Sequence, residues 1–183
     1  NMNNMMRNVK IKDKVFEIFI PETEISAIIH SMAKNINEMR IKNPLFISVL
    51  NGSFLFTADI MRRITIPNSE ISFIKLSSYS GLSSRGKIDK LIGLSESIKG
   101  RNIIILEDII DTGITLEKTI ELLKAKDVDD IKIATLLFKP EAYTKKINID
   151  FIGKSIANDF VVGFGLDYYE IGRNLPHIYK LKN

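Results

Sequence analysis

The 183-residue sequence predicts an α/β fold in which a mainly parallel central sheet is flanked by helices. Short runs rich in β-branched residues alternate with segments of helical periodicity, and proline or glycine often separates the two. Two of these runs, 45–50 and 102–106, are almost entirely apolar. Such strands are typical of the interior of a parallel sheet, because helices cover both of its faces.

The individual elements follow from the same patterns. We expect strands over 14–20, 45–50, 71–76, 102–106 and 131–138, and helices after Pro21, over 54–64 and over 115–125. The first helix has apolar residues at helical spacing before Pro44, namely Ile25, Ile28, Met32, Ile36 and Met39. The last helix turns Leu116, Ile120 and Leu123 inward. After Asp150 the pattern changes to short runs that predict extra strands or a flap.

Composition limits the class of protein. With 45% hydrophobic residues the chain can bury one good core, so we expect 1–183 to form a single domain. The net charge of +4 comes without a basic block and suits small anions at least as well as nucleic acid. Cysteine is absent, which excludes thiolate metal sites and suits the cytoplasm. No apolar run approaches the roughly 18 residues of a membrane span, and the start lacks a signal-peptide core, so we expect no membrane.

The most informative stretch is "IIILEDIIDTGITLE", residues 103–117, which runs from an apolar strand into acidic residues and then into a helix. Ligands of an open parallel sheet bind beyond the carboxyl ends of its strands. At the turn over 111–115, free backbone N–H groups and the positive end of the helix favour a phosphate, and Gly113 permits close approach. The alternative is a plain helix N-cap at Asp111 or Thr112.

Capping leaves the neighbouring pair Glu107 and Asp108 unexplained. Two carboxylates at the end of a strand are costly unless they meet a cation or hydroxyl groups. Oxygen ligands are also what magnesium prefers. The stretch therefore predicts a site for magnesium and a sugar phosphate.

Residues 103–116 resemble the phosphoribosyl-diphosphate signature of the type I phosphoribosyltransferase family. Asp111, two places before the glycine, resembles the hypoxanthine-guanine (6-oxopurine) branch, because relatives acting on adenine or orotate usually carry a small residue or threonine there. The similarity extends in the family's order from about Val49 to Arg173.

The resemblance implies the family's architecture. A core of about 25–150 would carry a small hood made from about 10–20 and 151–183, and a mobile lid loop would cover about 77–93. The lid segment is rich in serine, glycine and charge, which by itself predicts only an exposed, mobile loop. We also expect a homodimer or homotetramer, as is common in the family.

The resemblance also implies a reaction and its residues. The family's purine salvage enzymes transfer the phosphoribosyl group from 5-phosphoribosyl diphosphate to N9 of hypoxanthine or guanine, giving IMP or GMP and pyrophosphate, with Mg²⁺. Asp111 would accept the proton from the purine, while Glu107 and Asp108 hold the ribose hydroxyls and magnesium. The 5′-phosphate would bind Asp111, Thr112, Gly113, Ile114 and Thr115, and pyrophosphate would bind Asn51, Gly52, Ser53, Ser78, Tyr79 and Arg173. The purine would meet Lys139, Phe160, Val161 and Asp167, and Asp167 would also bind a second magnesium.

The turn at Leu50–Ser53 departs from the family pattern. Members bind pyrophosphate there through backbone N–H groups, helped by a cis peptide before the second residue, and often have lysine or arginine where this chain has Asn51. A plain tight turn is the alternative for an Asn-Gly pair. For Phe160, composition alone would place the ring in the core; only the run from Phe160 to Tyr168, read whole, points to the purine.

Three other functions remain open. A phosphoribosyltransferase for xanthine or a pyrimidine would share the phosphate turn but change Asp111 or the region of Lys139 and Phe160. A regulatory protein that senses the sugar donor and binds DNA or RNA would need a winged helix or a basic face, and the short N-terminus leaves little room for the former. A structural protein on a generic α/β domain would not explain several matched sites in the family's order.

Overall fold

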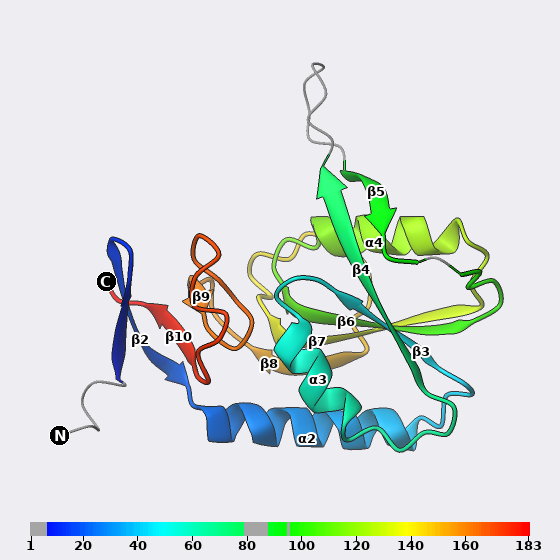
Figure 1. The fold of residues 1–183 in the computed structure, drawn as a ribbon, viewed down its shortest axis with the longest axis horizontal. Coiled ribbons are helices and arrows are strands. Elements are labelled where there is room, and N and C mark those ends of the chain that lie inside the picture. Colours follow the sequence, from blue (N-terminus) through cyan, green and yellow to red (C-terminus); the bar gives the residue numbers. More distant parts are fainter. Residues whose placement is uncertain (1–6, 79–87, 95) are drawn as a thin grey trace.

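The computed structural model describes residues 7–78, 88–94 and 96–183 and contains a six-stranded and a four-stranded sheet (Figure 1). The elements in chain order are β1 (Asn8–Ile11), β2 (Lys14–Ile20), α2 (Glu22–Glu38), β3 (Leu45–Val49), α3 (Phe54–Met61), β4 (Glu70–Ser78), β5 (Ile88–Ile92), β6 (Asn102–Ile110), α4 (Ile114–Lys124), β7 (Asp130–Phe138), β8 (Phe151–Ser155), β9 (Val161–Val162) and β10 (Ile178–Leu181). No helix among these residues combines the length and apolar character that crossing a membrane requires.

The six-stranded sheet has the order β5-β4-β3-β6-β7-β8. All its neighbours pair in parallel except β4 and β5, which are antiparallel. The strands predicted as the sheet interior, β3 and β6, lie next to each other with other strands outside them, and every residue of β3 is buried. The prediction of a mainly parallel α/β fold is confirmed.

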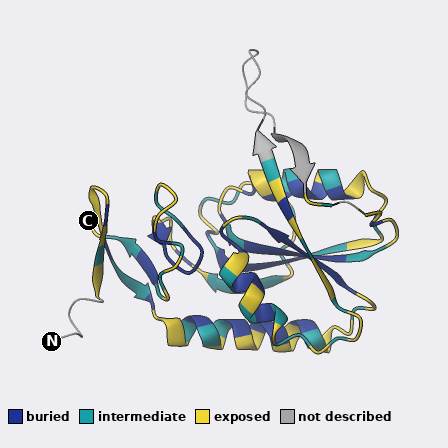
Figure 2. Cartoon of the chain, viewed as in Figure 1, coloured by how far each residue is buried: buried dark blue, intermediate teal, exposed yellow. Residues whose placement is uncertain are grey.

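Helices cover both faces of this sheet. Phe46 and Ile104 belong to a core cluster with α2 and α3, whereas their neighbours Ile47 and Ile105 pack in a second cluster with α4. This division follows from the alternation of side chains along a strand. In Figure 2 the central strands are largely dark blue, and each helix turns a buried side toward them. The predicted inward residues of the last helix, Leu116, Ile120 and Leu123, are buried.

The four-stranded sheet is the hood, formed by both ends of the described chain in the order β1-β2-β10-β9. It lies at one end of the molecule, on the left in Figure 1. The predicted hood boundary at 151 is too early, because β8 pairs in parallel with β7 and so belongs to the central sheet. The C-terminal part of the hood begins only after β8.

Other boundaries also differ from the sequence-based ones. β6 continues past Leu106 to Ile110, because its pairing with β7 runs on to Phe138. Met39 lies just after α2 and is 49% exposed, so it is not part of the apolar face. The predicted lid over 77–93 includes the end of β4 and all of β5, so these parts form strands rather than a loop, and its central residues, 79–87, lie outside the described part of the chain.

Candidate active site

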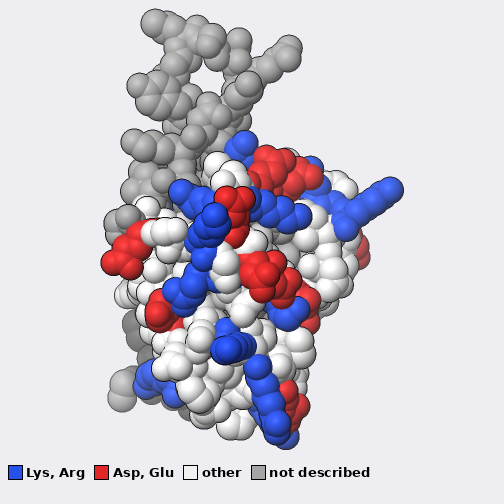
Figure 3. Space-filling model, turned by 90° about the vertical axis from the view of Figure 1, so that its right-hand side faces the viewer, with Lys and Arg blue, Asp and Glu red and all other residues white. Residues whose placement is uncertain are grey.

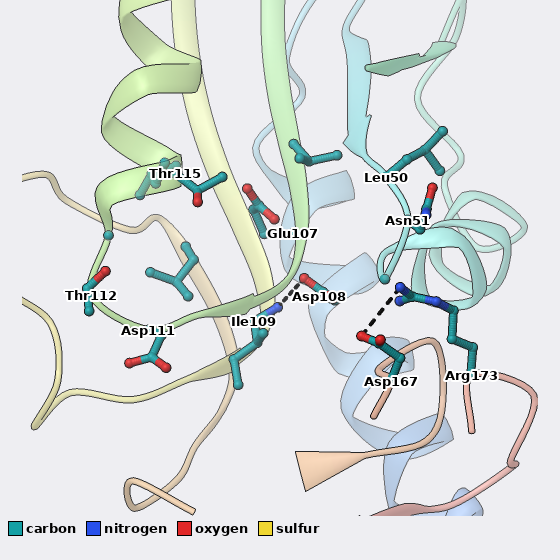
Figure 4. A pocket seen from close by; sticks show the side chains of 15 residues that line it. Leu50, Asn51, Glu107, Asp108, Ile109, Asp111, Thr112, Thr115, Asp167 and Arg173 are labelled. Atoms are coloured by element: carbon teal, nitrogen blue, oxygen red, sulfur yellow. Dashed lines mark hydrogen bonds and ion pairs between the residues drawn. The ribbon is translucent and has the colours of Figure 1, made fainter. Parts of the chain in front are cut away.

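A pocket of about 330 Å³ opens at the carboxyl ends of β3 and β6. Its walls come from the turn before α3, the last residues of β6, the turn into α4 and a loop of the hood (Figure 4). This is the edge of the sheet at which the sequence placed the sugar-phosphate site. Most of the predicted phosphate, ribose and pyrophosphate residues therefore lie together.

The turn between β6 and α4 offers free backbone donors to this pocket. Gly113 is buried and left-handed, with φ +87°, and α4 has no side-chain cap. Within the described part of the chain, no hydrogen bond is donated by the backbone N–H groups of Asp111, Thr112, Gly113, Thr115 or Leu116. Successive N–H groups around a left-handed residue at a helix N-terminus form an anion-binding nest. The plain N-cap interpretation is wrong, and the turn fits a phosphate.

Asp111 and Lys139 lie side by side beyond the ends of β6 and β7. Lys139 Nζ is 3.5 Å from Asp111 Oδ2. The lysine is 7% exposed, whereas the carboxylate side chain is 49% exposed and lines the pocket. The strand register explains the pairing, because Ile110 and Phe138 are direct neighbours in the sheet. Asp111, the predicted proton acceptor, and Lys139, the predicted hydrogen-bond donor to the purine, are thus in contact.

The two carboxyl groups at the end of β6 are held in a poorly solvated place. Burial raises the pKa of Glu107 well above its usual range, and the nearby Asp108 raises it further. Burial also raises the pKa of Asp108 to about 6, although the Ile109 N–H, 2.8 Å from its Oδ1, and Arg173 oppose the rise. Both groups would gain from sugar hydroxyls or a cation, as the sequence suggested.

The turn at Leu50–Ser53 contains the cis peptide that the resemblance implied, between Leu50 and Asn51. A side chain at Gly52 would overlap Asp108 Oδ2, so only glycine lets this turn approach the acidic end of β6. The Ser53 side chain is buried and hydrogen-bonded to Ser48 Oγ, 2.6 Å away, which turns its hydroxyl away from the pocket. Only the backbone of Ser53 remains available to a ligand.

Arg173 brings the hood against this turn. Its guanidinium lies 3.3 Å from Asp167 Oδ1 and donates to the carbonyl of Gly165 at 2.9 Å (Figure 4). A Cβ at Gly165 would overlap the carbonyl of Gly52, so hood and turn touch through their glycines. Arg173, Asp167 and Asp108 therefore line the same pocket.

Some predicted site residues lie outside this pocket. The Phe160 ring is 45% exposed, so the core interpretation is wrong; it stands 5.7 Å from the ring of Tyr168. Val161 is buried in β9. The Ile114 side chain is exposed and does not line the pocket. Ser78 ends β4 and nothing is described of its side chain, while Tyr79 lies outside the described residues.

The candidate metal ligands do not form a site by themselves. Among residues 7–78, 88–94 and 96–183, no group of three or more His, Asp or Glu side chains is arranged to hold a metal ion. Asp108 and Asp167 are close enough for the charge of Asp167 to raise the pKa of Asp108. Magnesium is often held by one or two carboxylates, with water and substrate phosphates completing the shell. The donor set therefore fits magnesium that shares oxygen atoms of the substrate.

The sequence analysis missed residues 140–148, here called the strap, which pack against the turn over 111–115. The strap follows β7 without forming a helix or strand. Lys145 Nζ lies 2.6 Å from Glu117 Oε2 in α4, and the Tyr143 ring packs edge-on against Phe138 with centroids 5.2 Å apart. Pro140 was its only signal, and it marked the end of a strand rather than a function.

Comparison with known proteins agrees with this geometry. The model of the family described as "Phosphoribosyl transferase domain" matches residues 21–169. The hypoxanthine-guanine phosphoribosyltransferase of Streptococcus pyogenes serotype M3 is 49% identical over 77% of this chain and 78% of its own. The hypoxanthine phosphoribosyltransferase of Salmonella typhimurium is 39% identical over 90% of this chain and 94% of its own.

A solved structure is similar over most of the fold. The hypoxanthine phosphoribosyltransferase of Staphylococcus aureus superimposes with a TM-score of 0.80 at 35% identity, covering 91% of both chains. The family match spans most of the chain, and the relatives agree with it in sequence and in fold. The chain therefore belongs to the phosphoribosyltransferase family.

Proposed function

We propose that this protein is a purine salvage enzyme, a hypoxanthine phosphoribosyltransferase. It transfers the phosphoribosyl group from 5-phosphoribosyl diphosphate to N9 of hypoxanthine or guanine, giving IMP or GMP and pyrophosphate. One observation carries the proposal: the uncapped turn at Gly113, the buried pair Glu107 and Asp108, and the Asp111–Lys139 contact meet at one edge of the sheet. The names of the relatives support the same base and reaction.

The turn over 111–115 anchors the 5′-phosphate of the donor. Its free N–H groups and the N-terminus of α4 supply positive partial charge where the phosphate lies. The anchor is remote from the bond that breaks, at the anomeric carbon of the ribose. Binding energy from this remote group holds the reacting carbon in place for attack.

Asp111 is the general base. As pyrophosphate leaves, positive charge builds on the sugar, and the attacking purine must lose a proton from its five-membered ring. Asp111 takes that proton, a role that contributes about 10²–10⁴-fold to the rate. Glu107 and Asp108 hold the ribose hydroxyls, and negative charge on either group, once ionised, favours the cationic sugar.

Pyrophosphate is held by the Asn51–Ser53 backbone and by Arg173. When bound, Mg²⁺ neutralises the charge that grows on the leaving group. Glu107, Asp108 and Asp167 are the residues that would hold it, together with oxygens of the substrate. Arg173 lies 3.3 Å from Asp167, so the residue proposed to bind pyrophosphate is next to a proposed magnesium ligand, which supports this assignment.

The purine lies between the hood and the end of β7. Lys139 donates to the 6-oxo group, Phe160 stacks on the ring, the Val161 backbone reads its edge, and Asp167 borders the same space. The contact of Lys139 with Asp111 supports this assignment, because it brings the proposed donor to the 6-oxo group close to the proposed base.

We also propose that 1–183 acts as one phosphoribosyltransferase domain, in the cytoplasm, as a homodimer or homotetramer. Nucleic acid is not a partner in this proposal. On the face shown in Figure 3, acidic and basic side chains are intermixed rather than gathered into one basic surface. The net charge of +4 suits a small anionic substrate at least as well as a polyanion.

The test is pyrophosphate release from 5-phosphoribosyl diphosphate with hypoxanthine, guanine, xanthine or adenine, each with and without magnesium. We expect magnesium-dependent release with hypoxanthine or guanine and little with adenine. Asp111→Asn is the matched control, because it keeps size and removes the base. Release with adenine alone, or equal release from this variant, would contradict the proposal.

A further inference from the structure

We propose that Thr144, in the strap, is a positioning residue that aims the backbone N–H of Gly113 at the 5′-phosphate. The inference rests on the proposed function and adds a residue that the family motif does not contain. Thr144 is exposed and does not line the pocket. It acts through the peptide group between Thr112 and Gly113.

Thr144 holds the carbonyl of that peptide with two hydrogen bonds. Its backbone N–H and its side-chain Oγ1 each donate to the carbonyl oxygen of Thr112, at 3.1 Å in both cases. The bond between residues 112 and 113 is trans, so its C=O and N–H point in opposite directions. Fixing the carbonyl toward the strap therefore fixes the Gly113 N–H on the other side, toward the pocket.

The strap also prevents the turn from rotating outward. Around buried Gly113, a Cβ atom would stand 2.6 Å from Tyr143 Cε2 and 2.8 Å from Lys145 Cγ. Side chains of the strap thus fill the space on the outer side of the turn. Gly113 has the left-handed φ of +87° that forms the anion-binding nest. Tyr143 and Lys145, the neighbours of Thr144, pack against it and hold it in this conformation.

The strap itself does not depend on Thr144. The Tyr143 hydroxyl donates to the carbonyl of Ile147 at 2.7 Å, and its ring packs against Phe138. Lys145 pairs with Glu117 of α4 at 2.6 Å. These contacts hold the strap on both sides of residue 144. Loss of the threonine hydroxyl should therefore change the orientation of the Gly113 N–H and leave the strap in place.

This placement predicts a selective effect on ligands that carry a 5′-phosphate. The donor and the product IMP use the turn, whereas hypoxanthine and pyrophosphate lie at other parts of the site. A variant that only loosens the turn should weaken binding of the sugar donor and IMP and leave binding of hypoxanthine and pyrophosphate unchanged. A general loss of structure would weaken all four.

The experiment compares Thr144→Val, which keeps the shape and removes the Oγ donor, with Thr144→Ser, which keeps the donor. Calorimetry gives Kd for IMP and for pyrophosphate, and steady-state kinetics gives KM for each substrate and kcat. We expect Thr144→Val to raise Kd for IMP and KM for the sugar donor about three- to tenfold, the size of one hydrogen bond. Thr144→Ser should restore both values, with KM for hypoxanthine and Kd for pyrophosphate unchanged throughout.

Lys145→Met is the control for the strap, because it removes the ion pair with Glu117 and leaves the carbonyl of Thr112 bonded. We expect it to bind IMP almost as the wild type does. Should Thr144→Val fold poorly, Thr144→Ala removes the same donor with less bulk and gives the same comparison. If Thr144→Val binds IMP as tightly as an active wild type, the positioning role is wrong. If the wild type itself neither binds IMP nor releases pyrophosphate, the proposed function fails first.

Discussion

Gly113→Ala should damage both the stability of the fold and the binding of the sugar donor. The added Cβ meets Tyr143 and Lys145 at 2.6 and 2.8 Å, and the residue must keep φ +87°. The left-handed conformation costs an L-residue about 1–2 kcal/mol. Crowding in a packed site adds about 1–3 kcal/mol. We expect the free energy of unfolding to fall by about 2–5 kcal/mol.

Gly100→Ala is the matched control. Gly100 also has a left-handed backbone, with φ +71°, but nothing lies within 4 Å of its Cβ position. It precedes β6 and so lies at the opposite edge of the sheet from the pocket. This variant should show only the backbone cost of about 1–2 kcal/mol and no change in binding. The difference between the two variants isolates the contact of the turn with the strap.

Urea unfolding followed by circular dichroism measures the stability of each variant; the chain has no tryptophan to report by fluorescence. Calorimetric titration with 5-phosphoribosyl diphosphate measures affinity. If the added Cβ displaces the turn, at least one charge-assisted hydrogen bond from its N–H groups to the phosphate is lost, which is worth about 1.5–3 kcal/mol. Affinity for the sugar donor should then fall about tenfold or more. Wild-type affinity in Gly113→Ala would refute the phosphate turn.

Three further predictions follow from the site. Asp111→Asn should lower kcat with hypoxanthine at least about tenfold while leaving affinity for the sugar donor nearly intact; unchanged turnover would remove Asp111 from the mechanism. Asp108→Asn should stabilise the ligand-free protein by up to about 3 kcal/mol at pH 8 and little at pH 4, in urea titrations. The sign follows because the folded pKa of about 6 lies above the ordinary value of 3.8 for this carboxyl group, so the wild type loses stability as pH rises from 3.8 to about 6. Phe160→Ala should raise KM for hypoxanthine several-fold and spare KM for the sugar donor, and an equal rise in both would exclude a stacking role.

Patterns within single segments predicted most of the central sheet. The unbroken apolar runs of β3 and β6 identified its interior, and the spacing of Leu116, Ile120 and Leu123 identified the inner face of α4. The hood boundary was misplaced because β8 is short and only partly buried, so its sequence resembles the flap that follows. Its membership in the sheet depends on pairing with β7, which no local pattern encodes.

The acidic and glycine residues of the site were predictable for a different reason. Residues 103–117 hold Glu107, Asp108, Asp111 and Gly113 in one continuous stretch, so this part of the site can be recognised without knowledge of the fold. Contacts between distant segments were not predictable in this way. The bonds from Thr144 to Thr112 and the close approach of Gly165 to Gly52 arise only when the chain is folded.

The burial of Ser53 was missed for a similar reason. In the sequence, its hydroxyl is placed to donate a hydrogen bond to a phosphate. In the structure, Ser48 Oγ is hydrogen-bonded to both the Ser53 and the Thr57 hydroxyls, so the three form a buried network. Ser48 is the one polar residue of an otherwise apolar strand. That exception was the available signal that a neighbouring side chain would turn inward to satisfy it.

The location of the donor phosphate is the central claim, and a crystal structure with 5-phosphoribosyl diphosphate and magnesium tests it most directly. We predict the 5′-phosphate within hydrogen-bond distance of the backbone N–H groups of Thr112, Gly113 and Thr115, with the ribose hydroxyls facing Glu107 and Asp108. Electron density for the donor at another surface, with this turn empty, would contradict the account.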